Sequence, residues 1–139
     1  MRDEFKTVKL TMTNFVEVKN DDDKVIDVKP VTESKEYILM FNINVIDEID
    51  VKYKTSDKKG FNVFLEKLES KDVADIWKTS VDFLTMCVNE GIRQKNAFKK
   101  AAGLCEDDYI LPEQLNIPAQ NASILAMDVL GNGMPESKN

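Results

Sequence analysis

The chain has 139 residues, 42% of them apolar, which suits one folded domain with a core of its own. Its 25 acidic residues outnumber its 19 basic ones, and the net charge of −6 argues against a nucleic-acid partner because phosphate backbones would be repelled. Histidine is absent, which removes the commonest general base and the commonest metal-binding imidazole.

Strand patterns fill the N-terminal third of the sequence. Between residues 8 and 18, apolar and polar residues alternate as in a strand, with Phe15 as an odd apolar residue on the opposite face. Residues 20–24 then predict a turn. Residues 25–28 predict a return strand that stops before Pro30, because proline disfavours the interior of a sheet.

The hydrophobic period changes from that of a strand to that of a helix at Asn42. Residues 32–35 predict a second polar turn, and residues 35–42 predict a third strand. Asn42 or Asn44 can then cap a helix over residues 43–53, whose early acidic and late basic residues suit the helix dipole. Residues 1–42 are therefore expected to form a small antiparallel sheet of about three strands.

The longest helix is expected in the middle of the chain, after a short one-faced helix over residues 61–68. It begins at Ser70 or Asp72 and reaches about Asn89, and Gly91 is placed to terminate it. Its broad apolar sector predicts that it is the core helix.

Three further elements follow. A basic helix over residues 92–102 ends at Gly103, residues 112–115 form a helical turn, and a last helix spans residues 118–130 with Gly131 just past its end. We therefore predict an α+β fold in which the sheet packs on four to five α-helices. The sheet of residues 1–42 and the helical part of residues 43–131 form one domain, and residues 132–139 form a flexible tail.

No group of residues predicts an active site, a cofactor site or a metal site. Residues 21–23 lack the pattern of a calcium loop, and the carboxylates of residues 47–50 are explained by the helix dipole. Cys87 falls on an apolar helix face, Cys105 precedes acidic residues that disfavour its thiolate, and a disulfide between them stays open. The chain shows no signal peptide and no apolar run of roughly 20 residues, so we expect a cytoplasmic protein without a membrane span.

The candidates for partner binding lie on two helices. Met86 projects from the otherwise polar stripe of the longest helix. The last helix is apolar nearly all round, with the large side chains Ile124, Leu125, Met127, Val129 and Leu130. One face can complete the core and the other then suggests a partner or a second subunit, but complete burial explains the same pattern equally well.

Four patterns follow one another within residues 31–116: a strand read as EYILMFNIN, a helix IDEIDVKY, a short FxxFLEKL helix and the long apolar helix. In this order they resemble the tail assembly chaperones of long-tailed, siphovirus-like bacteriophages and prophages. The sequence GMPE at residues 133–136 is similar to endings in that family, whereas the strand pair of residues 5–28 is an addition to its pattern.

The resemblance implies a non-enzymatic protein of the bacterial host cytoplasm that is absent from the mature virion. Such chaperones bind and solubilise the tape measure protein and help to recruit tail tube subunits, and copies are expected to form a homo-oligomer. The family transfers no site residue to this chain. The alternative is a structural virion protein, such as a tail terminator or a connector ring subunit.

Overall fold

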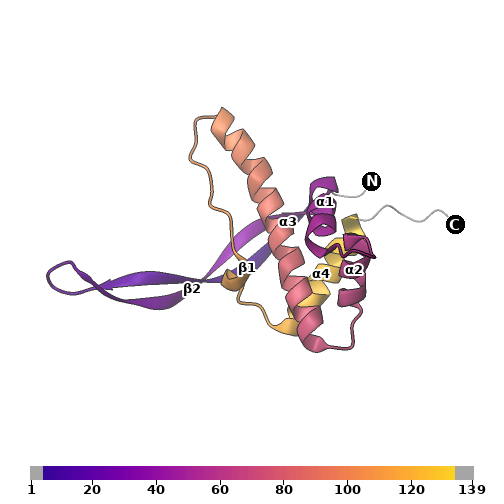
Figure 1. Ribbon diagram of the computed structural model, residues 1–139. Coiled ribbons are helices and arrows are strands. Elements are labelled where there is room, and N and C mark those ends of the chain that lie inside the picture. The colour runs from indigo at the N-terminus through magenta and orange to yellow at the C-terminus, as the bar shows by residue number, and fades with distance from the viewer. Residues whose placement is uncertain (1–4, 134–139) are drawn as a thin grey trace.

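The computed structural model describes residues 5–133 and confirms an α+β architecture (Figure 1). Its elements are β1 (Phe5–Lys19), β2 (Val25–Met40), α1 (Ile43–Tyr53), α2 (Gly60–Leu68), α3 (Val73–Ala101), the 3-10 turn η1 (Pro112–Gln114) and α4 (Ala119–Gly133). The described chain thus has one two-stranded antiparallel sheet and four α-helices, rather than about three strands and up to five helices. Most of the expected tail, including the end of the GMPE sequence, lies outside the described residues.

The second and third expected strands are one strand, β2. Pro30 lies inside it, directly opposite Phe15, and the expected turn at residues 32–35 continues the same ladder. Each strand of a two-stranded ribbon keeps one free edge, where the missing N–H of proline is tolerated. Threonine also favours extended backbone, so the polar composition of residues 32–35 does not break the strand.

The turn between β1 and β2 is confirmed. The side-chain oxygen of Asn20 accepts hydrogen bonds from the backbone N–H groups of Asp22 and Lys24, both at 3.0 Å. Asp23 adopts a positive φ of 63°, a conformation that Asp and Asn tolerate better than most residues. The acidic run therefore serves the geometry of the turn.

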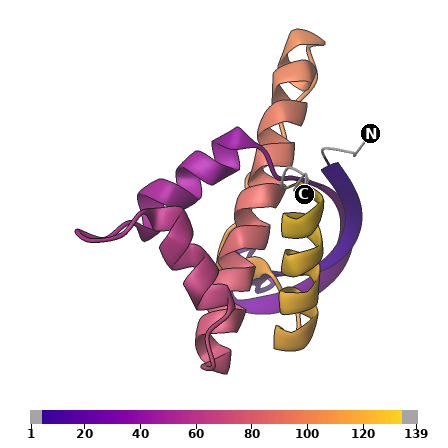
Figure 2. The same ribbon diagram turned by 90° about the vertical axis from the view of Figure 1, so that its right-hand side faces the viewer.

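Helix α3 runs through the middle of the molecule, with α1 and α2 on one side and α4 on the other (Figure 2). Phe83 of α3 lies at the centre of the core, with its ring centroid 5.2 Å from that of Phe41 and 5.4 Å from that of Phe64. From the sheet, Leu10, Met12 and Leu39 are buried against the helices. Only the base of the ribbon therefore contributes to the core.

The expected end of the longest helix at Gly91 was wrong, because α3 continues to Ala101 and includes the predicted basic helix. Gly91 is buried where α3 crosses β2, and a Cβ atom at this position would lie 2.1 Å from the carbonyl oxygen of Ile38. Glycine is thus required for a close helix–strand approach. The helix stops before Gly103, as expected, and φ of this residue is +75°.

Two segments project from the body in different directions (Figure 1). One is the ribbon beyond its contacts with η1, and we call residues 15–30 the arm. The other is the last part of α3, residues 92–101, which we call the α3 end. The base of the arm is fixed where Asn14 contacts Gln114 and where the Asn116 N–H donates to the Thr11 carbonyl oxygen at 2.9 Å.

Candidate partner-binding surfaces

Helix α4 carries most of the residues predicted to bind a partner, and it packs along α3 (Figure 2). Its inner face contains Ala122 and Ala126, both fully buried, whose small side chains permit a close approach. Val129 and Leu130 are buried on the same side and belong to the core. The helix ends at Gly133, so the expected end before Gly131 was wrong by a few residues.

The outer side of α4 keeps a small apolar surface. Ile124 and Met127, three residues apart on neighbouring turns, are 61% and 50% exposed. Leu125 is half-buried and packs against the core at the edge of this surface. We call Ile124, Leu125 and Met127 the α4 face. Asp128 beside it forms an ion pair with Lys6 of β1.

Met86 is buried in the core cluster, and this placement makes it a packing residue of α3. The predicted set is therefore divided by the fold: Met86, Val129 and Leu130 lie inside, whereas the α4 face borders solvent. Sequence periodicity alone could not make this division, since α4 is apolar on both sides.

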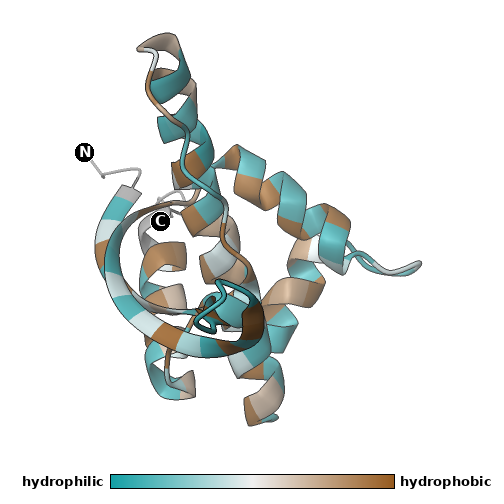
Figure 3. Ribbon diagram, turned by 90° about the vertical axis from the view of Figure 1, so that its left-hand side faces the viewer, coloured by the Kyte–Doolittle hydropathy of each residue, from teal (hydrophilic) through white to brown (hydrophobic). Residues whose placement is uncertain are grey.

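The arm is a second apolar surface, and the sequence marked it only through the odd position of Phe15. Hydrophobic residues are interspersed with hydrophilic ones along the arm (Figure 3). The register places Phe15 opposite Pro30 and Glu17 opposite Val28, so these four side chains share one face of the ribbon. We call these four residues the outer arm face. Phe15 is 66% exposed, and Ile26 and Val28 are each more than half exposed.

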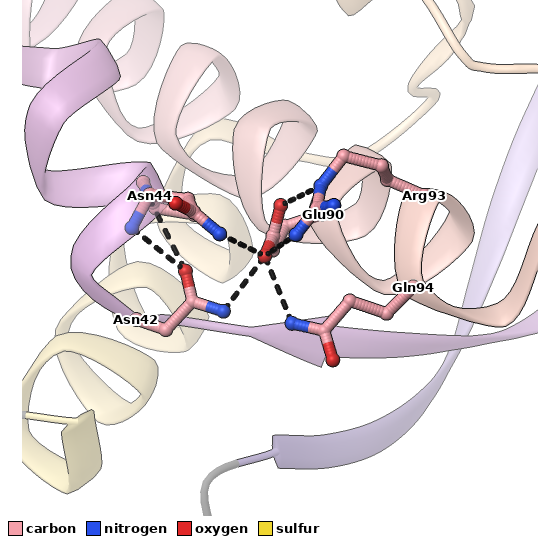
Figure 4. A network of polar contacts seen from close by, with 6 residues as sticks. Asn42, Asn44, Glu90, Arg93 and Gln94 are labelled. Atoms are coloured by element: carbon pink, nitrogen blue, oxygen red, sulfur yellow. Dashed lines mark hydrogen bonds and ion pairs between the residues drawn. The ribbon is translucent and has the colours of Figure 1, made fainter. Parts of the chain in front are cut away.

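Glu90 of α3 is the centre of a buried polar network (Figure 4). Its side chain is only 6% exposed. It accepts hydrogen bonds from Asn42 at 2.7 Å, Asn44 at 3.0 Å, Gln94 at 2.9 Å and Arg93 at 2.8 and 2.7 Å. A carboxylate that accepts this many bonds has little capacity left to take a proton.

The role of this network is structural. The Arg93 guanidinium, together with the amide donors, holds the pKa of Glu90 well below its usual range, although burial acts in the opposite direction. Asn42 caps α1 by accepting hydrogen bonds from the N–H groups of Asn44 and Val45, at 3.1 and 3.4 Å, which confirms one of the two predicted caps. Glu90 thereby joins the end of β2 and the start of α1 to α3.

Tyr53 and Cys87 are two further ionisable groups that pack against or within the core. The Tyr53 hydroxyl donates to Asp82 at 3.1 Å, and Lys52 forms an ion pair with the same carboxylate at 3.2 Å. Burial, followed by the negative charge of Asp82, raises the pKa of Tyr53. Burial likewise raises the pKa of the Cys87 thiol, which therefore stays protonated and unreactive at neutral pH.

A cleft of about 560 Å³ lies between the base of the ribbon, α3 and the segment of residues 106–110. This segment is fixed to α3 by Asn96, which exchanges two hydrogen bonds with the backbone of Asp107, at 2.9 and 2.7 Å. The Asp107 carboxylate pairs with Lys99 at 2.8 Å and with Lys95 at 3.8 Å. The Asp107 charge at the cleft is thus held by two lysines, and we assign no ligand to the cleft.

Among residues 5–133, no group of His, Cys, Asp and Glu side chains is placed to hold a metal ion. No helix in the same part of the chain is long and apolar enough to cross a membrane. Cys87 is buried and Cys105 is exposed, and both are free thiols, so the disulfide that the sequence left open is not formed.

Comparison of the chain with protein-family models, with curated proteins and with solved structures found no match. The function of the chain therefore has to be inferred from the surfaces described above.

Proposed function

We propose that this protein is a tail assembly chaperone of a long-tailed bacteriophage or prophage, which acts by reversible binding and not by catalysis. It would bind and solubilise the tape measure protein in the host cytoplasm, help to recruit tail tube subunits, and be absent from the mature virion. The proposal rests on the order of the strand and helix patterns in residues 31–116 and on one structural observation, the exposed α4 face.

The α4 face supports this proposal because its apolar side chains lie on a regular helix whose opposite side is held in the core. Ile124 and Met127 are spaced to meet an apolar stripe on another helix, as in helix-in-groove recognition. The tape measure protein of such phages is long, apolar and helical, and it needs this kind of cover before assembly. The acidic body, with a net charge of −6, would keep the complex in solution.

The first test is co-expression of this chain with the tape measure protein encoded in the same genome, followed by co-purification on a tag. The expected result is a larger soluble fraction of the tape measure protein and elution of the two chains together. A tape measure protein that stays insoluble while this chain elutes alone would contradict the proposal.

A matched pair of variants tests the α4 face itself. Ile124→Asp places a charge in the centre of the face and should weaken co-purification at least tenfold, because a buried unpaired charge is costly. Val51→Asp makes the same change at a 72% exposed position on α1 and should leave binding unchanged. Leu130→Asp is unsuitable, since Leu130 is buried and its loss would unfold the domain. If Ile124→Asp and Val51→Asp bound the tape measure protein equally well, the α4 face would not be the binding surface.

The alternative is a structural virion protein, such as a tail terminator or connector ring subunit. The arm favours this alternative, because a protruding ribbon with apolar side chains suits a permanent contact between subunits. Mass spectrometry of purified particles separates the two functions. A structural subunit is recovered with the particles in fixed stoichiometry, whereas a chaperone is missing from them.

A further inference from the structure

Two asparagines of α3 bind a returning part of the chain through its backbone. Residues 104–111 follow α3 and run back along it towards the base of the ribbon (Figure 1), and we call them the strap. Asn96 donates to the Asp107 carbonyl oxygen at 2.9 Å and accepts from the Asp107 N–H at 2.7 Å. Asn89 makes the same exchange with Ile110, at 3.0 and 2.8 Å. These contacts use only backbone groups of the strap, which nearly every peptide segment can offer.

The spacing of the two asparagines matches an extended peptide. Seven residues of an α-helix rise about 10.5 Å, and three residues of extended chain span about 10 Å. Asn89 and Asn96 are seven residues apart on α3, and their partners Ile110 and Asp107 are three residues apart. The strap therefore runs antiparallel to α3 with an extended backbone, as a peptide bound to this helix would.

Two side chains of the strap add specificity to these backbone contacts. The Asp107 carboxylate pairs with Lys99 at 2.8 Å and with Lys95 at 3.8 Å. The Ile110 side chain is only 6% exposed and belongs to the core cluster. The site thus favours a segment in which an acidic residue precedes a branched aliphatic residue by three positions.

The strap has few other contacts with the body of the protein. Residues 104–109 and Leu111 are all exposed. In the part of the chain that the structure describes, no backbone–backbone hydrogen bond joins residues 105–110 to another element. Segments with few buried side chains open locally at low free energy. When the strap opens, the amides of Asn89 and Asn96 lose these partners and become available to another peptide.

We propose that Asn89 and Asn96 form a binding site for an extended peptide and that the strap is its resident, displaceable occupant. The partner is a protein segment with an acidic residue three positions before Ile, Val or Leu, bound in the direction of the strap. Because the two compete for one site, the apparent dissociation constant is the intrinsic one divided by the fraction of chains whose strap is open. The site lies apart from the α4 face and does not depend on the function proposed above.

A fluorescent peptide with the sequence of residues 104–111, with serine in place of Cys105, probes the site in the full chain by fluorescence anisotropy. Binding to the wild type should be weak because the strap competes. Asp107→Lys repels Lys95 and Lys99, favours the open strap and should tighten peptide binding roughly tenfold. Asp108→Lys is the matched control, since neither asparagine binds the backbone of Asp108, and it should behave like the wild type.

Two further changes show whether the asparagines hold the peptide by its backbone. Asn96→Ala in the Asp107→Lys chain should weaken binding roughly tenfold or more. N-methylation of the peptide at the residues equivalent to Asp107 and Ile110 removes both donated N–H groups and should have the same effect. N-methylation at the residue equivalent to Asp108 should leave binding unchanged. Peptide binding that survives Asn96→Ala or the double N-methylation would overturn the proposal, because the peptide would then be bound elsewhere.

Hydrogen exchange of the wild type tests the opening of the strap without any substitution. The N–H groups of Asp107 and Ile110 should exchange together and at least tenfold faster than those in the buried part of α3. Exchange as slow as in the core would show a strap that does not open and would overturn the proposal. Failure of the Asp107→Lys chain to bind the peptide, with the fold intact by circular dichroism, would also overturn it.

Discussion

The contact between Gly91 and β2 permits a stringent test of the fold. In Gly91→Ala the new Cβ would lie 2.1 Å from the carbonyl oxygen of Ile38, so helix and strand would have to part by more than about 1 Å. The neighbour is backbone and cannot rotate away, and overpacking of this kind costs about 3 kcal/mol. Alanine gains about 1 kcal/mol over glycine in helix propensity. We expect a net loss of about 2 kcal/mol in the free energy of unfolding.

Urea denaturation monitored by circular dichroism measures this loss, and Gly131→Ala provides the matched control. Gly131 also lies in a helix, but within the described chain no atom comes within 4 Å of its added Cβ. The control should therefore gain about 0.5–1 kcal/mol from helix propensity alone. The effects of the two substitutions on the free energy of unfolding should have opposite signs and differ by about 3 kcal/mol. A Gly91→Ala variant as stable as the wild type would refute the close approach of α3 to β2.

Three further predictions concern polar groups. Glu90→Gln should cost about 2–3 kcal/mol at neutral pH, because several donors lose a charged acceptor. Because the network lowers the pKa of Glu90, the stability that the ionised carboxylate contributes is present above about pH 4.5 and is lost as the pH falls. The melting temperature of the variant should therefore fall less on acidification than that of the wild type. A thiol reagent should label Cys105 in the native protein and Cys87 only after unfolding; rapid native labelling of both would contradict the burial of Cys87. Tyr53→Phe removes the hydrogen bond to Asp82 and should cost about 1 kcal/mol by urea denaturation, whereas unchanged stability would show that this bond contributes nothing.

Helices α1 and α2 were predictable because their signals are local. Asn42 caps α1 at the expected position, and the periodicity of residues 61–68 is that of α2. Gly91 and Pro30 misled the prediction for a common reason. Each usually breaks regular structure, yet each is tolerated here because of a contact or a free edge that depends on the tertiary arrangement.

The surfaces were harder to predict than the elements. Periodicity identified α4 as apolar on several sides, but only the packing of Ala122 and Ala126 on α3 shows that Ile124 and Met127 face outward. The role of Glu90 was not predictable from the sequence because two of its donors, Asn42 and Asn44, lie far from it in the chain, at the start of α1. The outer arm face depends on the register between two strands, since Phe15 and Val28 share a face only after the ribbon is aligned.

The α4 face and the arm belong to different elements, so their contacts should be separable. Ile124→Asp should lose the tape measure protein in co-purification, whereas Phe15→Glu, at a 66% exposed position on the arm, should keep it. If Phe15→Glu also abolished binding while the fold stayed intact, the arm would belong to the binding surface. The helix-in-groove contact at the α4 face would then be insufficient by itself, and affinity would come from two surfaces that act together.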